Sequence, residues 1–428
     1  MPATFRMGMA GRVRQLGDPD PAAWRWTDGE SSGADVVLMV YHDDPLPVND
    51  EFEDLSFPVF SQLQYATNCG LTLLHDIPCA PVVVKGEEQP NTEHFGFRDG
   101  ISQPVIRGTR RGSAAVPERD LLSPGEFLLG YQNDQGYVSP SITVGSQLDP
   151  ASNLPTLAES RVNRFPFFGN RNSDPERRDF GRNGTFLVLR QLDQDVDGFE
   201  AEMAQKAKEL DTKFPRLGEL LGRPVDADWL SAKVIGRWKD GTSLVASPHC
   251  PLGAIAPDND FAYGVDDPRG LACPLGSHIR RTNPRDSLEP GDADEQRITN
   301  RHRLLRRGRS YDYDADRKGE NRRGLLFAAL CSDLDRQFEF VQTHWAQART
   351  FHALTDEADP LLGHPDAEGG AFTGSGPRPT RFTVPSPVGP VTVEGLQSYV
   401  TMRGGGYFFL PSRSAISHLI SRLQHRTG

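Results

Sequence analysis

The sequence predicts an α+β protein with many turns and long connections. Segments typical of strands alternate with segments typical of helices along the chain. The 42 glycines and 34 prolines among 428 residues indicate irregular connections rather than a helical bundle. At roughly 100–200 residues per domain, this length is enough for two or three domains.

Four strands and one helix carry this prediction. Residues 34–41 (ADVVLMVY) and 81–85 (PVVVK) are β-branched and apolar between turn residues, which predicts two strands. Residues 184–192 (GTFLVLRQL) predict a third strand, and residues 196–210 carry apolar and alanine positions at helical spacing. Residues 399–410 predict a last strand with a glycine-rich bend.

A domain boundary is expected where the new strand and helix begin. Residues 108–182 are rich in Gly, Pro, Ser, Asn and Arg, and so long an irregular region is typical of a functional covering loop. We therefore expect a first domain at residues 1–182 and a second at residues 183–428.

Charge and cysteine content limit the classes of function. The formal net charge is −11, which disfavours a nucleic-acid or anionic-membrane partner. Apolar runs are far shorter than the ~20 residues of a membrane span, and the N-terminus shows no export signal. The five cysteines are an odd number and widely spaced, so no disulfide framework is indicated. These features predict a soluble protein of the cytoplasm.

The segment at 94–104 (HFGFRDGISQP) places Asp99 between two glycines and beside aromatic residues. One interpretation puts Asp99 against an apolar wall, where burial would raise its pKa and suit it to proton transfer. The alternative is an Asp-Gly turn whose side chain caps its own backbone, which the spacing alone favours.

Two further segments concentrate positive charge, at 273–285 (CPLGSHIRRTNPR) and at 301–308 (RHRLLRRG). Nine arginines lie in residues 278–309 on a chain of net negative charge. A solvated face with salt bridges would explain them. An anion site for a ligand with carboxylate arms is the functional alternative, with His278 binding a metal that the ligand carries.

A zinc site is a further hypothesis. His249, Cys250, Cys273 and His278 supply the right atoms, but their spacing matches no standard zinc module. The sequence contains no nucleophile elbow and no H-E-x-x-H helix, so hydrolase chemistry has no support.

Taken together, GFRDGISQP at 96–104, HIRRTNPR at 278–285 and RLLRRG at 303–308 resemble the dye-decolorizing peroxidase family of haem enzymes. GTFLVLRQL at 184–192 and GGGYFFLPS at 404–412 extend the resemblance over nearly the whole chain. The long insertions resemble those of the larger, C-type members.

The resemblance implies a haem b peroxidase that reduces hydrogen peroxide and oxidises dyes, phenols or similar small aromatic reductants through an oxoferryl intermediate. His278 corresponds to the proximal axial ligand of the haem iron. Asp99 corresponds to the distal acid that moves a proton between the peroxide oxygens, and Arg306 to the distal arginine.

The resemblance also implies residues around the haem edge. Asn283 and Arg285 match positions near the haem propionates, and Arg281 and Arg280 compete for the same role. Many haem peroxidases place a carboxylate behind the proximal histidine. Two acids are candidates for it here, Glu394 and Asp359.

The family fold implies two ferredoxin-like domains, each with a four-stranded antiparallel sheet. Met1 then falls inside the first domain, so this domain is expected to be shortened at its N-terminus and to expose a sheet edge. Two other functions stay open, a haem-binding or deferrochelation protein with little catalysis, and a zinc protein. A homo-oligomer is also open.

Overall fold

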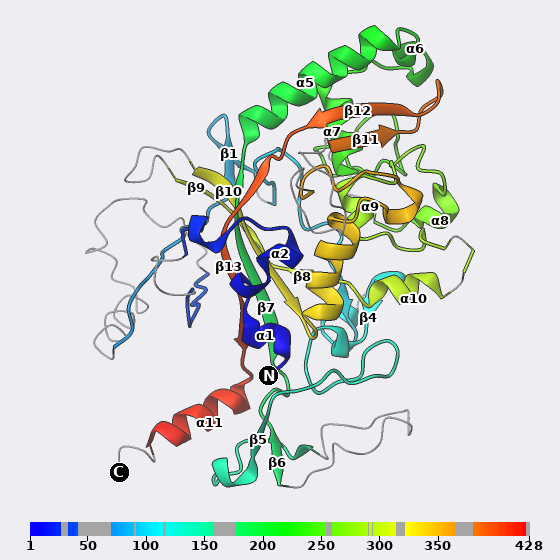
Figure 1. The fold of residues 1–428 in the computed structure, drawn as a ribbon. Helices are drawn as coiled ribbons and strands as arrows, with labels where there is room; N and C mark the ends of the chain where they lie inside the picture. The colour runs from blue at the N-terminus through cyan, green and yellow to red at the C-terminus, as the bar shows by residue number, and fades with distance from the viewer. Residues whose placement is uncertain are drawn as a thin grey trace.

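A five-stranded antiparallel sheet forms the centre of the computed structural model of the chain (Figure 1). The strands run in the order β13, β7, β10, and both β8 and β9 pair with the other edge of β10. Their bounds are Thr185–Gln194 (β7), Leu305–Arg306 (β8), Arg309–Tyr313 (β9), Arg322–Cys331 (β10) and Val400–Leu410 (β13). The structure describes residues 1–26, 33–41, 70–89, 91–113, 117–157, 176–253, 259–289, 291–292, 294–313, 322–363 and 380–424.

Strand β7 is the central strand, since it pairs with β10 on one side and β13 on the other. Val188 lies opposite Ala329 of β10 and opposite Tyr407 of β13. The first seven residues of β7 are buried, because both faces of the sheet are covered at this point. The strands predicted at 184–192 and 399–410 are confirmed.

The N-terminal residues cover one face of the sheet (Figure 1). Helices α1 (Ala3–Met7) and α2 (Val13–Leu16) bring Met9 and Leu16 into one hydrophobic cluster with residues of β7. Arg12 also pairs bidentately with the buried carboxylate of Glu339. Residues on both sides of position 182 therefore share a core, and the boundary at 182/183 stays a prediction.

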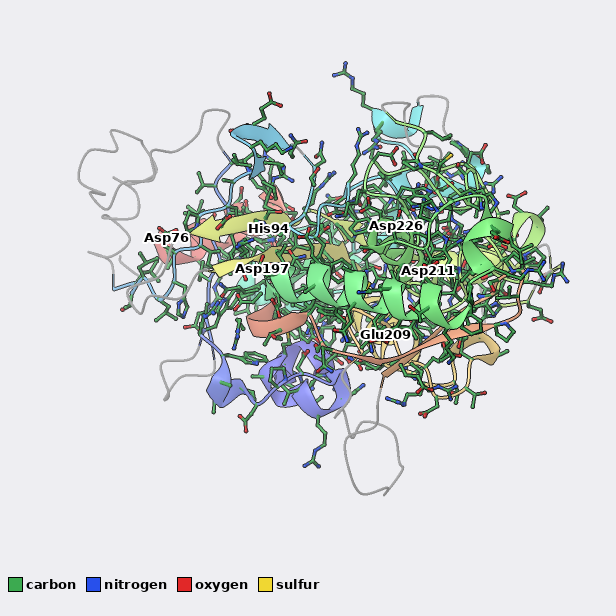
Figure 2. All side chains as sticks on the ribbon, turned by 90° about the horizontal axis from the view of Figure 1, so that it is seen from above. Asp76, His94, Asp197, Glu209, Asp211 and Asp226 are labelled. Carbon is green, nitrogen blue, oxygen red and sulfur yellow. The ribbon has the colours of Figure 1, made fainter. Side chains whose placement is uncertain are left out.

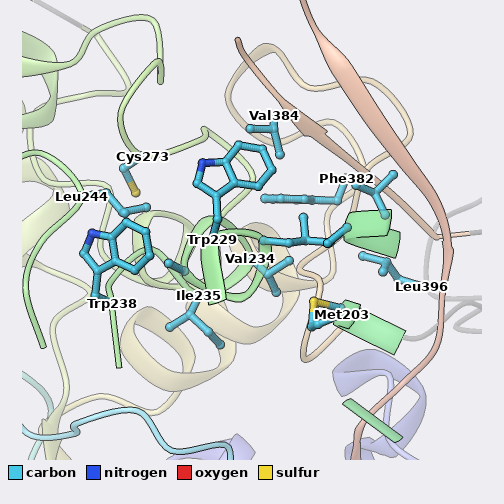
Figure 3. Packing of buried hydrophobic residues seen from close by; sticks show 14 of the residues in the cluster. Met203, Trp229, Val234, Ile235, Trp238, Leu244, Cys273, Phe382, Val384 and Leu396 are labelled. Carbon is cyan, nitrogen blue, oxygen red and sulfur yellow. The ribbon is translucent and has the colours of Figure 1, made fainter. Parts of the chain in front are cut away.

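A second hydrophobic cluster lies beside the sheet (Figure 3). Helices α5 (Val196–Lys213) and α7 (Ala227–Ile235) and the hairpin β11 (Thr380–Val384) to β12 (Val391–Leu396) contribute to it. Trp229 of α7 is fully buried there, and Phe95 and Phe97 join the cluster from the segment that precedes Asp99. This packing anchors the Asp99 loop to the body of the protein.

A carboxylate side chain caps the N-terminus of both α5 and α7. Asp195 accepts the Gly198 N–H at the start of α5, and Asp226 accepts the Trp229 N–H at the start of α7. Asp197 lies in the first turn of α5, where a negative charge is favourable for the helix dipole (Figure 2).

The remaining elements are short. The helices are α6 (Leu217–Leu221), α8 (Tyr263–Asp266), α9 (His278–Thr282), α10 (Glu295–Asn300) and α11 (Arg413–Gln424). Two-stranded pairs join β1 (Val82–Val84) to β2 (Glu87–Gln89), β3 (Val105–Ile106) to β4 (Leu121–Leu122), and β5 (Thr143–Gly145) to β6 (Arg177–Asp179). None of the helices in the described ranges is both long enough and apolar enough to span a bilayer.

The strand predicted at 34–41 is wrong. Residues 36–41 form neither a helix nor a strand, and they pair with no strand in the described part of the chain. Val37 and Met39 pack toward the cluster that contains Trp26, whereas Val36 and Leu38 are exposed. An apolar alternating segment becomes a strand only where a neighbour accepts its hydrogen bonds, and here no described strand does. The strand predicted at 81–85 is confirmed as β1.

The α+β class is confirmed. The described residues form one five-stranded sheet and four two-stranded pairs, rather than a resolved pair of four-stranded sheets. The division into two ferredoxin-like domains therefore stays a prediction. Residues 117–157 contain only short strands and single helical turns, as expected for a covering loop.

His302 is a buried titratable residue of the fold. Its ring stacks on Phe340 with centroids 3.9 Å apart and meets the edge of Trp345 at 5.0 Å. Its Nδ1 bonds to the backbone carbonyl of Arg336, an acceptor, so Nδ1 carries the proton. Burial lowers the pKa of His302 from 6.5 to about 4.

The lowered pKa of His302 predicts that the free energy of unfolding decreases at acidic pH. Between pH 6.5 and about 4 the unfolded chain binds a proton at His302 that the folded chain does not, so stability falls as the pH drops, by up to roughly 3 kcal/mol. His302→Phe keeps the stacking and is expected to remove this part of the slope, as measured by urea unfolding across the window. The exposed His249→Gln is the control. An unchanged slope in His302→Phe would contradict the assignment.

Candidate active site

Helix α9 places His278 at its first position. The buried Ser277 precedes it, and the Ser277 hydroxyl donates to the carbonyl of Lys233 on α7. The Lys233 ammonium in turn donates to the carbonyl of Ala272. These two bonds attach the turn before His278 to α7, so a rigid helix fixes the start of α9.

Asp359 holds the His278 ring. Nδ1 of His278 lies 2.9 Å and 3.2 Å from the two carboxylate oxygens of Asp359. The Asp359 side chain is fully buried, whereas 26% of the His278 side chain is exposed. The Leu361 and Leu362 N–H groups donate to the same carboxylate. The opposite ring nitrogen, Nε2, has no partner among the residues that the structure describes.

The two groups shift each other's pKa. Burial alone would lower the pKa of His278, but the Asp359 carboxylate outweighs it and raises the pKa. Burial alone would raise the pKa of Asp359, but its attraction and hydrogen bond to His278, with Arg281 nearby, lower it. Asp359 is therefore the charged partner of this histidine.

The structure decides between the two acids that the sequence left open. Glu394 lies on β12, is largely exposed, and faces Arg381 with Nε and Oε1 3.9 Å apart. The prediction of Glu394 as the carboxylate behind His278 is therefore wrong, and the alternative, Asp359, is correct. The sequence could not rank them, because Asp359 lies 81 residues from His278 in a segment with no distinctive pattern.

Arg281 attaches the segment that carries Asp359 to α9. Its three nitrogens donate to the backbone carbonyls of Trp345, Ala348 and Glu357. The guanidinium is fully buried, and burial lowers its pKa to about 10. One short helix thus fixes both the histidine and the segment that holds its acid.

The loop that carries Asp99 is a tight turn. The Asp99 N–H donates to the Asn91 carbonyl (2.7 Å), and the Gly100 N–H donates to Asp99 Oδ1 (2.6 Å). Glu93 braces the turn by accepting the N–H groups of Phe95 and Phe97. Asp99 is exposed, so the predicted Asp-Gly turn is confirmed and the predicted burial against an apolar wall is wrong.

Arg306 lies at the end of β8, which pairs with β10. Its backbone N–H donates to Gln103 Oε1 (3.1 Å), and its side chain is half-buried. The Arg306 guanidinium has no hydrogen-bond or ion-pair partner within the described ranges. An unpaired guanidinium is suited to an anionic ligand.

Electrostatics link the three positions. After burial and Asp359, the remaining contributions to the pKa of His278 come from Arg306, which lowers it, and Asp99, which raises it. Such contributions fall off with distance. Two contacts join the segments directly, since Asn283 at the end of α9 lies 3.5 Å from Ser102 and the Arg306 N–H donates to Gln103. The segments that carry Asp99, His278 and Arg306 are therefore adjacent.

Of the residues predicted at the haem edge, Asn283 keeps a buried oxygen without a partner among the described residues, whereas Arg285 and Arg281 make hydrogen bonds within the protein. Asn283 ends α9 with its Nδ2 3.5 Å from Ser102 Oγ, and its buried Oδ1 has no hydrogen-bond partner. Arg285 donates to the carbonyls of Asn259 and Phe261, and its guanidinium lies 3.9 Å from the centre of the Phe261 ring. Arg285 and Arg281 are thus occupied within the protein.

The zinc hypothesis finds no support in the arrangement. Cys273 is buried, with Sγ 3.8 Å from the Tyr263 hydroxyl, whereas His249 and Cys250 are exposed. Across the described segments, no group of three or more His, Cys, Asp or Glu side chains could hold a metal ion. The four residues are not gathered, because His278 faces Asp359 instead.

The buried pair predicts unequal effects of the two acids on stability. Asp359→Ala leaves two N–H groups without an acceptor and removes the charge opposite His278, so the free energy of unfolding is expected to fall by about 2–4 kcal/mol. Glu394→Ala, at the surface, should change it by less than about 0.5 kcal/mol. Urea unfolding of the ligand-free protein measures both. Equal effects would contradict the assignment of Asp359.

Comparison with characterised proteins identifies relatives over nearly the whole chain, although no sequence model of a protein family matches it. The chain is 30% identical to the multifunctional dye peroxidase DyP2 of Amycolatopsis sp., covering 97% of this chain and 77% of that protein. It is 27% identical to the dye-decolorizing peroxidase msp1 of Mycetinis scorodonius, covering 94% of this chain and 69% of the relative. A match to the deferrochelatase of Yersinia pestis is 37% identical but covers 22% of this chain and 19% of that protein.

Solved structures show the same fold. A mutant of the dye-decolorizing peroxidase from Pleurotus ostreatus superposes with a TM-score of 0.64 at 22% identity, covering 98% of this chain and 80% of that one. An ancestral D-type dye-decolorizing peroxidase gives a TM-score of 0.65 at 23% identity, covering 97% and 80%. The C-type assignment stays a prediction. By its similarity to DyP2, the chain belongs to the dye-decolorizing peroxidase family and is a peroxidase.

Proposed function

We propose that this chain is a haem b peroxidase that reduces hydrogen peroxide and oxidises dyes, phenols or similar small aromatic one-electron donors. One observation carries the proposal. An imidazole, a carboxylate and a guanidinium lie on three segments that hydrogen bonds join, and each keeps a polar atom without a partner among the described residues. These atoms are His278 Nε2, Asp99 Oδ2 and the Arg306 guanidinium.

The residues fit a haem. A histidine that donates one ring N–H to a buried carboxylate and leaves the other nitrogen free is typical of metal-binding histidines, so His278 would hold the iron. The buried, unpartnered Oδ1 of Asn283 suits a polar group of the haem edge. Because Arg281 and Arg285 already donate to backbone carbonyls, we propose that they support this site rather than bind propionates.

The chain's own residues would act on peroxide as follows. Bound haem supplies the redox chemistry. Asp359 keeps the proton on His278 Nδ1 and directs the Nε2 lone pair outward. Asp99 would accept a proton from one peroxide oxygen and return it to the other, which then leaves as water. The positive charge of Arg306 stabilises the negative charge that develops on that oxygen.

Relatives support the class of donor. A dye-decolorizing peroxidase that shares the fold, with a TM-score of 0.63, is described in complex with 2,6-dimethoxyphenol. We propose phenols of this kind as donors for this chain. A cytoplasmic location and a homo-oligomeric state remain predictions from the sequence.

A haem-binding or deferrochelation role without robust catalysis is the second candidate. The 37% identity to a deferrochelatase over 92 residues favours it. The response of the Soret band to peroxide distinguishes the two candidate functions. A peroxidase changes its Soret band rapidly with one equivalent of peroxide, whereas a haem carrier keeps the band unchanged.

Three substitutions test the assigned roles. His278→Ala is expected to abolish the Soret band of protein purified with haem, because the axial ligand is lost. Asp99→Ala is expected to retain the band but lower the second-order rate constant with peroxide by roughly 10²–10⁴-fold. Arg306→Leu should lower it by roughly 10²–10³-fold. Stopped-flow spectroscopy measures all three.

Control variants keep the test specific. Arg297→Leu removes an exposed arginine of α10, and His249→Ala removes an exposed histidine. Both are expected to leave the spectrum and the rates unchanged. Wild-type rates in Asp99→Ala and Arg306→Leu would refute the assigned mechanism, even with haem bound.

A further inference from the structure

Ser102 and Gln103, directly after the Asp99 turn, connect that turn to two other parts of the site. The Asn283 Nδ2 lies 3.5 Å from Ser102 Oγ, and Arg303 Nη2 donates to the Ser102 carbonyl (3.2 Å). The Arg306 N–H donates to Gln103 Oε1 (3.1 Å). The segment that carries Asp99 is therefore tied both to the end of α9 and to β8.

The bond from Arg306 to Gln103 has a structural cause. Successive N–H groups of a strand point to opposite sides. The Arg307 N–H donates to the Ala328 carbonyl of β10, so the Arg306 N–H points away from the sheet. No strand in the described part of the chain accepts it at this edge, and the Gln103 side chain accepts it instead. Since a backbone N–H can only donate, Gln103 must present its oxygen.

We propose that Gln103 is a positioning residue that fixes Arg306 relative to Asp99. The inference rests on the proposed function in so far as that function assigns Arg306 to peroxide. Gln103 lies four residues after Asp99 in the same segment, and its side chain reaches the backbone of Arg306 itself. Gln103 is half-buried, its side chain makes one hydrogen bond to the described residues, and it belongs to none of their hydrophobic clusters.

The relative placement matters because the two groups carry opposite charge. The contacts of Ser102 and Gln103 hold the Asp99 segment against both the end of α9 and Arg306, so a shift of either segment would change the placement of one charge relative to the other. If the Arg306 backbone moves by about 1 Å, its guanidinium moves away from an anionic ligand and their attraction weakens. The hydrogen bond to Gln103 would limit that movement.

The first experiment measures the bond directly in the ligand-free protein. Gln103→Met keeps the length of the side chain but removes the oxygen, whereas Gln103→Glu keeps an oxygen that accepts. Hydrogen exchange at the Arg306 amide is expected to accelerate about tenfold in Gln103→Met and to stay within about twofold in Gln103→Glu. Gln205→Met on α5 is the matched control, since the Gln205 side chain donates to its helix neighbour Glu209 at the surface. Equal exchange in wild type and Gln103→Met would overturn the proposal.

The second experiment links the bond to the site. Cyanide binding to the ferric, haem-loaded protein is expected to weaken about tenfold in Gln103→Met and to recover in Gln103→Glu, while the apparent KM for a phenol donor stays constant. A merely structural role would lower the unfolding free energy without changing cyanide affinity.

The outcomes separate this inference from the proposed function. Faster amide exchange with unchanged cyanide affinity and unchanged peroxide rate would overturn the positioning role while the peroxidase assignment stands. A wild-type protein that takes up no haem would refute the proposed function and, with it, this inference. Joint loss in Gln103→Met and recovery in Gln103→Glu would support both.

Discussion

The hydrogen bond between His278 and Asp359 is the interaction on which the rest of the site depends. Asp359 is fully buried, and a buried carboxylate is tolerated only with a positive or donating partner on every side. His278 and two backbone N–H groups meet that requirement. The pair joins α9 to a segment about 80 residues further along the chain. Arg281 of α9 also donates hydrogen bonds to backbone carbonyls at and before that segment. The imidazole is therefore oriented before any ligand arrives.

The same part of the protein buries an unusual amount of positive charge. Arg280, Arg281 and Arg285 lie within six residues, and each is almost inaccessible to water. The solvated face that the sequence offered does not describe them, because they are buried, and the anion site stays a prediction. Arg280 pairs with Asp267, and the other two donate mainly to carbonyl oxygens. They are structural cations that hold loops without regular secondary structure, whereas the Arg306 guanidinium has no partner among the described residues.

Sequence patterns predicted what is local and missed what depends on distant partners. The strands at 184–192 and 399–410 follow from β-branched and aromatic runs, and the Asp99 turn follows from its Asp-Gly pair. The strand expected at 34–41 has the same local pattern but no described neighbour. Asp359 carries no pattern of its own, and its role is visible only when the fold places it behind His278. Gln103 was missed for the same reason, because its partner is a backbone group 203 residues away.

The pairing of β7 also constrains how the chain reaches this state. Its neighbours, β10 and β13, begin at residues 322 and 400, so the central strand pairs with nothing close to it in sequence. The chain loses conformational entropy when these long loops close, before the strand pairings stabilise it, and this makes folding slow. During synthesis β7 leaves the ribosome long before β13, and its hydrogen-bonding edge stays open until nearly the whole chain has emerged. We expect a nascent chain to need protection from aggregation over that interval.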